Sequence, residues 1–170
     1  MKKLLFIFIL LFSIQAEAKF APQKISWESL GEIKIGMNVK EVEKVLAQKI
    51  HSDVTKKPNE QCYIGSPKDS VSGVYFIITH WKLAAFGLNE TSPKNILTPE
   101  GLGISTPQNK ILSFYPKAKV EDQPYYPGGH IYTVYSKDGK SAMRIQSDGK
   151  KVISIQAGNK EEALYEEGCE

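Results

Sequence analysis

Residues 33–48 carry the hydrophobic spacing of a short amphipathic helix. Three apolar residues fall at positions i, i+3 and i+4 and would share one helical face: Val42, Val45 and Leu46. Asn38 precedes them, and Glu41 follows Asn38 by three residues, which is the spacing of a capping box. Such a pair satisfies N–H groups that the first helical turn leaves unpaired. The pattern therefore predicts a helix that begins after Asn38.

Residues 102–117 repeat this pattern less closely. Their apolar face would consist of Ile111, Phe114 and Tyr115. Thr106 is expected to cap this second helix, with Pro107 at its first position and Pro116 at its end. Because strand-like sequence follows each helix, the repeat suggests two related units.

The strand patterns differ between the two halves. Residues 74–80 are rich in β-branched and aromatic side chains, and they are expected to form a hairpin with residues 83–88 through a turn at Trp81 and Lys82. In the second half, alternating segments are separated by Asp-Gly pairs suited to tight hairpin turns: residues 130–135, 141–146 and 152–157. They predict a three-stranded antiparallel meander with one buried and one solvent-exposed face.

Together these elements predict an α+β fold of two related units, each a short helical segment packed on an antiparallel β-sheet. We place the boundary in the loop at residues 89–94, which gives units at 19–92 and 93–170. Lys2 and Lys3 precede an apolar run at 4–14 and a small-x-small sequence at 16–18, so residues 1–18 are expected to be a signal peptide. The run is shorter than the roughly 20 residues of a membrane span. We expect a periplasmic or secreted protein with no membrane span.

The net charge and the absence of known catalytic motifs argue against several classes of function. The formal net charge is only +3 and the lysines are scattered, so no nucleic-acid partner is expected. The acidic end, residues 160–170, is expected to be a solvated face. The chain lacks a GxSxG nucleophile motif, a zinc-binding HExxH motif and a glycine-rich phosphate loop. The expectation is a protein without catalytic activity, bound metal or cofactor.

Two cysteines occur in the chain, Cys62 and Cys169. In an oxidising compartment they are expected to form a structural disulfide that ties the C-terminus to the first unit. A closed loop of this length would stabilise the fold by about 4–5 kcal/mol on the chain-entropy model. A redox-active thiol and an intermolecular bridge remain alternatives, although no CxxC spacing favours them.

Residues 122–130, DQPYYPGGH, form the one segment that suggests a binding site. Tyr125 and Tyr126 lie between prolines, and His130 closes the segment. Tyrosines on a restrained loop offer large contact area at a small entropic cost. The alternative is that both tyrosines cover the sheet edge or the core while the glycines only turn the chain.

Some segments resemble known families. Gly36-Met37-Asn38 followed by KEVEKVL resembles the helix element of the outer-membrane assembly lipoprotein BamE (SmpA/OmlA) family, and the tandem unit is similar to the β-lactamase inhibitory protein fold. The second half, with TPEGLGIS, ILSFYP, PGGH and the final EGC, is similar to a group of uncharacterised bacterial periplasmic proteins.

The resemblance implies a noncatalytic periplasmic protein-binding module of the inhibitor, immunity or envelope-assembly type. Its partner would be another envelope or secreted protein. The alternative is a periplasmic protein that binds a small molecule or glycan through an aromatic loop over the sheet.

Overall fold

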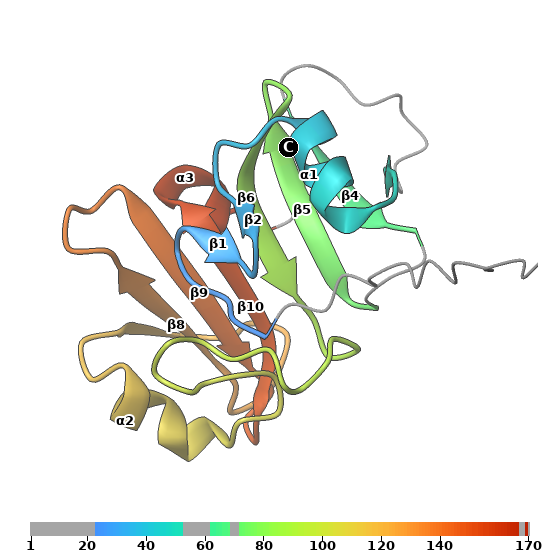
Figure 1. Cartoon of the computed structure of the whole chain (residues 1–170). Coiled ribbons are helices and arrows are strands. Elements are labelled where there is room, and N and C mark those ends of the chain that lie inside the picture. Colours follow the sequence, from blue (N-terminus) through green and yellow to red (C-terminus); the bar gives the residue numbers. More distant parts are fainter. Residues whose placement is uncertain (1–22, 53–61, 69–71, 167–168, 170) are drawn as a thin grey trace, which may run out of the picture.

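One antiparallel sheet of eight strands organises the chain (Figure 1). The computed structural model describes residues 23–52, 62–68, 72–166 and 169; the expected signal peptide and most of the polar segment after the first helix lie outside these ranges. The strand order across the sheet is β3-β4-β5-β6-β10-β9-β8-β7. The bounds are β3 Ile50–His51, β4 Cys62–Pro67, β5 Val74–Thr79, β6 Lys82–Leu88, β7 Lys119–Asp122, β8 His130–Tyr135, β9 Ser141–Ser147 and β10 Val152–Asn159.

The remaining elements are short. A two-stranded hairpin is formed by β1 Ser29–Leu30 and β2 Ile33–Lys34. The helices are α1 Val39–Leu46, the 3₁₀ turn Gln108–Lys110 that leads into α2 Ile111–Phe114, and α3 Lys160–Ala163. A small helical content beside a large antiparallel sheet confirms the predicted α+β class.

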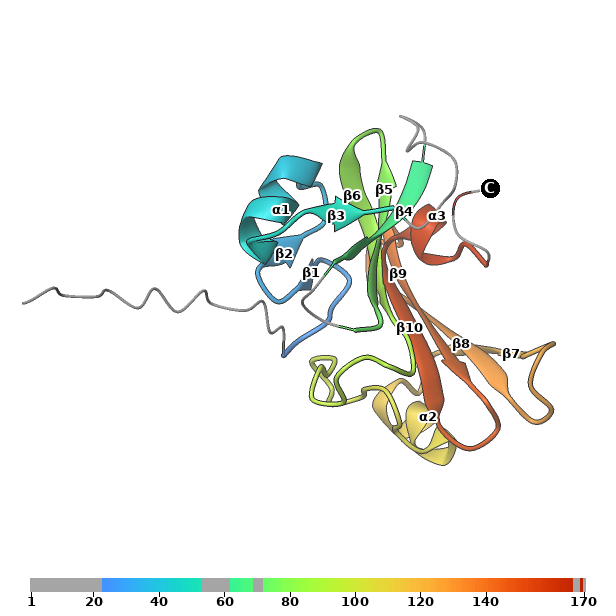
Figure 2. The same cartoon turned by 90° about the vertical axis from the view of Figure 1, so that its right-hand side faces the viewer.

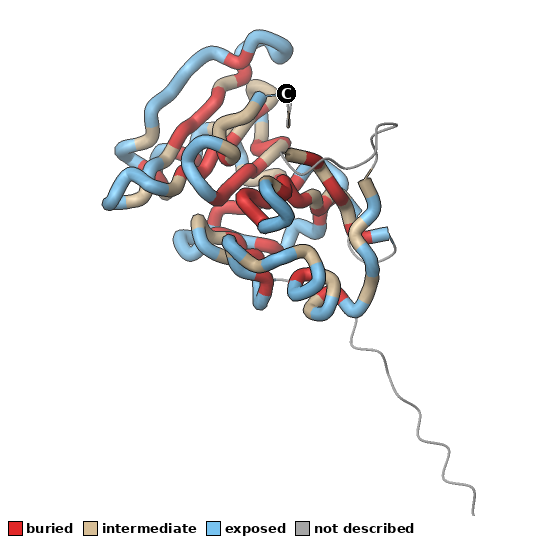
Figure 3. Tube along the Cα trace, turned by 90° about the horizontal axis from the view of Figure 1, so that it is seen from above, coloured by how far each residue is buried: buried red, intermediate tan, exposed pale blue. Residues whose placement is uncertain are grey.

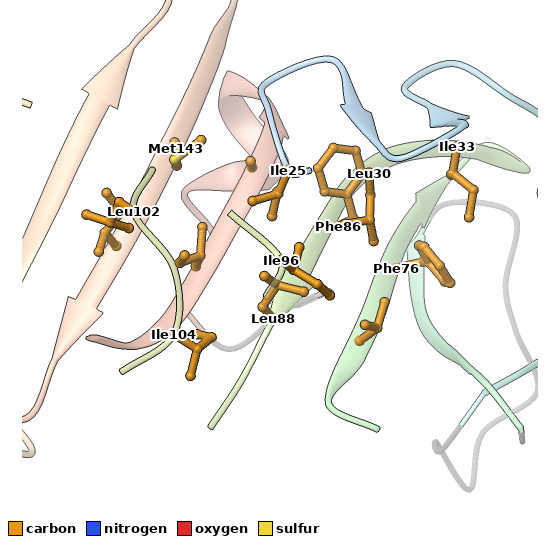
Figure 4. Close-up of a cluster of buried hydrophobic side chains, with 14 of the residues drawn as sticks. Ile25, Leu30, Ile33, Phe76, Phe86, Leu88, Ile96, Leu102, Ile104 and Met143 are labelled. Carbon is orange, nitrogen blue, oxygen red and sulfur yellow. The ribbon is translucent and has the colours of Figure 1, made fainter. Parts of the chain in front are cut away.

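The core lies on one face of the sheet, which we call the first face. Figure 2 shows α1, β1, β2 and α2 on this side and α3 on the other. Phe76 of β5 and Phe86 of β6 are fully buried opposite each other, and Ile155 of β10 continues the same apolar surface. Figure 4 shows Ile25, Leu30 and Ile96 packed against this surface from the covering segments.

Helix α1 forms as its sequence predicts. The backbone N–H of Glu41 donates to Asn38 Oδ1 at 3.1 Å, and the backbone N–H of Asn38 donates to Glu41 Oε2 at 2.8 Å. This reciprocal pair is the predicted capping box. Val42 and Leu46 are buried and Val45 is partly buried against the core, so the predicted apolar face is also confirmed.

The start of the second helix differs from the prediction. Ile111 and Tyr115 are buried and Phe114 packs partly against the core, as the spacing predicted. The predicted cap at Thr106 is wrong, because its Oγ1 accepts from the backbone N–H of Gly103 at 3.0 Å. No side chain caps the helical segment, which begins as a 3₁₀ turn. The Thr106 hydroxyl oxygen therefore closes a local turn with Gly103 instead of capping the helix.

The C-terminal meander has the predicted strands and turns. Gly139 and Gly149 of the two Asp-Gly pairs have φ values of +70° and +92°, the region that glycine adopts without steric cost. The prediction of one solvent-exposed face is wrong for the inner strands, since β10 is buried along most of its length. Figure 3 shows that buried residues, in red, gather toward the middle of the molecule. On the second face Arg144 is 7% exposed and Gln156 is 8% exposed.

The second face is covered by the chain's own C-terminal segment, α3 and the residues up to 166. This segment was expected to be a solvated acidic face, and that expectation is wrong for part of it. Ala163 is completely buried, and α3 packs on β6, β9 and β10. It lies over small side chains, Ala85 and Ala142, which allow its close approach. Within the described residues, no helix has the length and apolar character needed to cross a membrane.

Candidate functional site

The loop between β7 and β8, residues 123–129, is held at its base by a buried amide. The backbone N–H of Gln123 donates to Gly129 O at 3.0 Å, and its side-chain Nε2 donates to Gln146 Oε1 of β9 at 2.7 Å. Gln123 is 7% exposed. The backbone N–H of Gly129 also donates to Tyr126 O at 2.8 Å. These bonds fix the two ends of the loop relative to the sheet.

A second amide side chain holds the loop from the direction of α2. Gln108 Nε2 donates to Gly128 O at 3.1 Å, and Gln108 Oε1 accepts from Ser147 Oγ at 2.5 Å. Ser147 is fully buried. Gln108 therefore joins the β7–β8 loop to the last residue of β9. Sequence patterns could not reveal this link, because its members are 20 and 39 residues apart.

The two tyrosines of this anchored loop face solvent. Tyr125 is 74% exposed and Tyr126 is 41% exposed, and neither belongs to the buried core. Tyr125 also has its backbone N–H directed to Gln123 Oε1 at 3.4 Å. The loop thus presents two aromatic side chains from a backbone that hydrogen bonds hold in place.

His130 lies at the end of this loop, as the first residue of β8. Its backbone N–H donates to Ser147 Oγ at 3.0 Å and its carbonyl accepts from the same hydroxyl at 3.1 Å. Its ring centroid is 6.0 Å from that of Tyr132, and its buried Nδ1 has no hydrogen-bond partner. Nε2 is 3.7 Å from Asp122 Oδ1, but that carboxylate side chain is 98% exposed. Such an exposed pair is a poor general base, since water screens the carboxylate.

A cleft opens beside the same end of the sheet. It has a volume of about 480 Å³ and is lined by residues 107–109, Leu112, Tyr132 and residues 149–150. The walls come from the α2 segment, from β8 and from the β9–β10 turn. Burial raises the pKa of the Tyr132 hydroxyl, which stays neutral at physiological pH.

A polar row crosses the second face of the sheet. The strand registers place Tyr75, Gly87, Gln156, Arg144 and Thr133 side by side on five neighbouring strands. Tyr75 Oη donates to Gln156 Oε1 at 2.7 Å, a bond that reaches across the intervening glycine. Burial raises the pKa of Tyr75 to about 12.

The polar row binds the C-terminal segment. Gln156 Nε2 donates to the carbonyl oxygens of Glu162 at 3.0 Å and Tyr165 at 3.2 Å. Arg144 Nη2 lies 3.2 Å from Glu166 Oε1, and its Nη1 donates to Tyr165 O at 3.5 Å. The row is therefore satisfied within the chain. In the sequence, the polar row was indicated only by two polar residues, Arg144 and Gln156, which fall on one face of their predicted strands.

The predicted disulfide between Cys62 and Cys169 is present, with the Cα atoms 5.4 Å apart. Cys62 begins β4 opposite Thr79 of β5. The disulfide therefore lies at the end of the sheet away from the β7–β8 loop. The bond and the polar row together fasten the C-terminal segment over the second face.

The β5–β6 turn lies at the same end of the sheet as the disulfide. The β5–β6 turn consists of His80 and Trp81, one residue earlier than predicted, with φ values of +51° and +62°. Trp81 is 48% exposed and meets Tyr63 edge-on, with ring centroids 6.0 Å apart. Trp27 packs partly against the core, and His51 is an exposed residue of the short strand β3.

Among the described residues, no three His, Cys, Asp or Glu side chains are grouped closely enough to hold a metal ion. Comparisons of the chain with protein-family models and with curated protein sequences find no match.

Proposed function

We propose that this protein is a noncatalytic protein-binding module of the periplasm or another extracytoplasmic space, and that it binds its partner through the β7–β8 loop. One observation carries the proposal. Tyr125 and Tyr126 are exposed on a loop whose backbone is anchored by the side chains of Gln123 and Gln108. Exposed aromatic side chains on an ordered backbone are typical of binding surfaces.

The energetic reason is preorganisation. A tyrosine offers a large, amphipathic contact area and has only two rotatable side-chain bonds, so little conformational entropy is lost when it is buried in an interface. The loop is already ordered before any partner arrives, because Gln108 donates to its Gly128 carbonyl and its Gln123 side chain donates to Gln146. The conformational entropy of the loop is therefore lost during folding rather than during association.

The topology is consistent with a scaffold built from two related units, residues 19–92 and 93–170. Each half runs from a helical segment into four strands that pair in sequence, and the last strands, β6 and β10, pair with each other at the centre of the sheet. Such a scaffold would display the loop at one end of a long, rigid sheet. The inhibitor, immunity and envelope-assembly classes all use this kind of surface recognition, and the partner would be an envelope or secreted protein.

The test begins with the mature protein, residues 19–170, immobilised to capture partners from an envelope extract. Each captured protein is then purified, and its Kd for the soluble module is measured by biolayer interferometry. Alanine replacement of both Tyr125 and Tyr126 should weaken binding by about 30-fold or more, because truncation of central aromatic residues costs about 1–2 kcal/mol each or more. The melting temperature should change by less than about 3 °C, since both rings lie outside the core.

The matched control is Tyr135→Ala. Tyr135 is 43% exposed and lies at the end of β8, away from the loop. Its replacement should leave the Kd within about twofold. If the Tyr125→Ala/Tyr126→Ala variant bound as tightly as the wild type, or if no purified protein bound the module, the proposal would be wrong.

A further inference from the structure

The cleft beside α2 has features that the proposed protein-binding role does not use. It lies between the α2 segment, strand β8 and the β9–β10 turn, and its volume of about 480 Å³ is within the range of small-ligand sites, roughly 300–1,000 Å³. Among the described residues that line it, Lys150 is the only charged one and none is acidic. The cleft therefore favours an anionic ligand.

The nearest acid in sequence does not cancel this charge by a side-chain ion pair. Asp148 Oδ1 accepts from the backbone N–H groups of Lys150 and Lys151, both at 2.9 Å, and so closes the β9–β10 turn. Lys151 Nζ is directed to Glu90 at 3.9 Å. Lys150 is an exposed residue at the cleft wall.

The other walls combine amides with apolar surface. Gln108 is fixed by its bonds to Ser147 and Gly128, and Asn109 beside it is exposed. Leu112 of α2 is 45% exposed and Pro107 is exposed as well, whereas Tyr132 of β8 borders the cleft but is only 5% exposed. Amide groups hydrogen-bond hydroxyl groups as donor and acceptor, whereas leucine and proline side chains pack on an apolar ring face.

We propose that this cleft binds an acidic saccharide, with Lys150 on the carboxylate, Asn109 and Gln108 on ring hydroxyls, and Leu112 and Pro107 on the ring face. The charged, hydrogen-bonding and apolar parts of the walls match the carboxylate, the hydroxyl groups and the ring face of such a sugar. A neutral sugar would leave the lysine unused, and a simple carboxylate would leave the apolar wall uncovered.

The test is a titration of the ¹⁵N-labelled mature protein, followed by heteronuclear NMR at low salt. The probes are digalacturonate, the neutral disaccharide cellobiose, and glutarate as a carboxylate without a sugar ring. Digalacturonate should shift resonances of residues 107–112, 132 and 149–150 with a Kd of about 1 mM or tighter. Cellobiose and glutarate should each bind at least about tenfold more weakly.

Lys150→Gln should weaken digalacturonate binding by about fivefold or more, because it removes a charge-assisted hydrogen bond. Asn109→Ala should weaken it as well. The matched control is Lys137→Gln, which replaces an exposed lysine beside the other Asp-Gly turn and should leave the Kd unchanged. The proposal is overturned if 10 mM digalacturonate shifts no cleft resonance, if Lys150→Gln binds as well as the wild type, or if either comparison probe binds equally tightly.

The two sites share Gln108, but Lys150→Gln and Asn109→Ala leave its hydrogen bond to Gly128 of the β7–β8 loop in place. Protein binding that depends on Tyr125 and Tyr126 can fail while the sugar binds, and the reverse can also occur. The two proposals are therefore tested separately.

Discussion

Gly87 is the position where one added methyl group should disturb the second face of the sheet most directly. It lies in β6 between Tyr75 of β5 and Gln156 of β10, and the Tyr75 ring crosses it to reach the Gln156 side chain. A Cβ atom at Gly87 would overlap Tyr75 Cζ and Oη and would lie 2.5 Å from Cε1. Gly87→Ala therefore requires the Tyr75 ring to move away.

The expected cost can be worked from the contacts that Tyr75 would lose. Loss of its hydrogen bond to Gln156 Oε1 costs about 1 kcal/mol, and more if the buried acceptor finds no new partner. Partial exposure of the aromatic ring costs about 1–2 kcal/mol. Replacing glycine by alanine within a strand by itself stabilises the folded state by about 0.5–1 kcal/mol, which offsets part of this loss. The free energy of unfolding should fall by about 1–2.5 kcal/mol.

The assay is urea unfolding, followed by circular dichroism, of a double-mutant cycle. The single variant Gly87→Ala should show the full loss. In a Tyr75→Ala background, where no ring lies over the glycine, the same replacement should be neutral or slightly stabilising. The coupling between the two sites should therefore be about 2 kcal/mol or more. An equal loss in both backgrounds would refute the packing of Tyr75 on Gly87.

Three further predictions concern stability. Replacing Cys62 and Cys169 together by serine opens a loop that spans 107 residues, so urea unfolding should show a loss of about 4–5 kcal/mol; a loss below about 1 kcal/mol would contradict the cross-link. Because Tyr75 has a pKa of about 12, above its usual value of 10.0, the folded state holds this proton more tightly, and stability should fall by about 2–3 kcal/mol between pH 10 and pH 12. The Tyr75→Phe variant should lack this fall in stability. If its stability changed with pH as that of the wild type does, the prediction would be contradicted. Finally, His80→Asn should raise the melting temperature by a few degrees, because asparagine tolerates the positive φ of +51° better than histidine; a lower melting temperature would exclude that strain.

Local patterns predicted the elements whose partners are close in sequence. The first helix followed from Asn38, Glu41 and the apolar spacing behind them, since a capping box involves residues only three positions apart. The meander followed from alternation and from the two Asp-Gly pairs, whose glycines have the positive φ that such turns require. The disulfide followed from the presence of two cysteines in a chain expected to be exported.

The candidate site was predicted only in part. The segment DQPYYPGGH identified Tyr125, Tyr126 and His130, but its composition did not decide between tyrosines that bind a partner and tyrosines that cover the sheet edge or the core. The loop that carries the two rings is held by Gln108, which precedes α2, and by Gln123, whose partner Gln146 lies on β9. The cleft walls likewise come from segments that the sequence separates and the sheet brings together.

By itself, the sequence determined the α+β class, the capped first helix, the three-stranded meander and the cysteine pair, because each depends on short-range spacing or on composition. Only the tertiary structure decided that Arg144 and Gln156 are buried rather than exposed to solvent. The physical reason is that the C-terminal segment returns across the second face, and no alternation of polar and apolar residues within a strand can show what another part of the chain will cover.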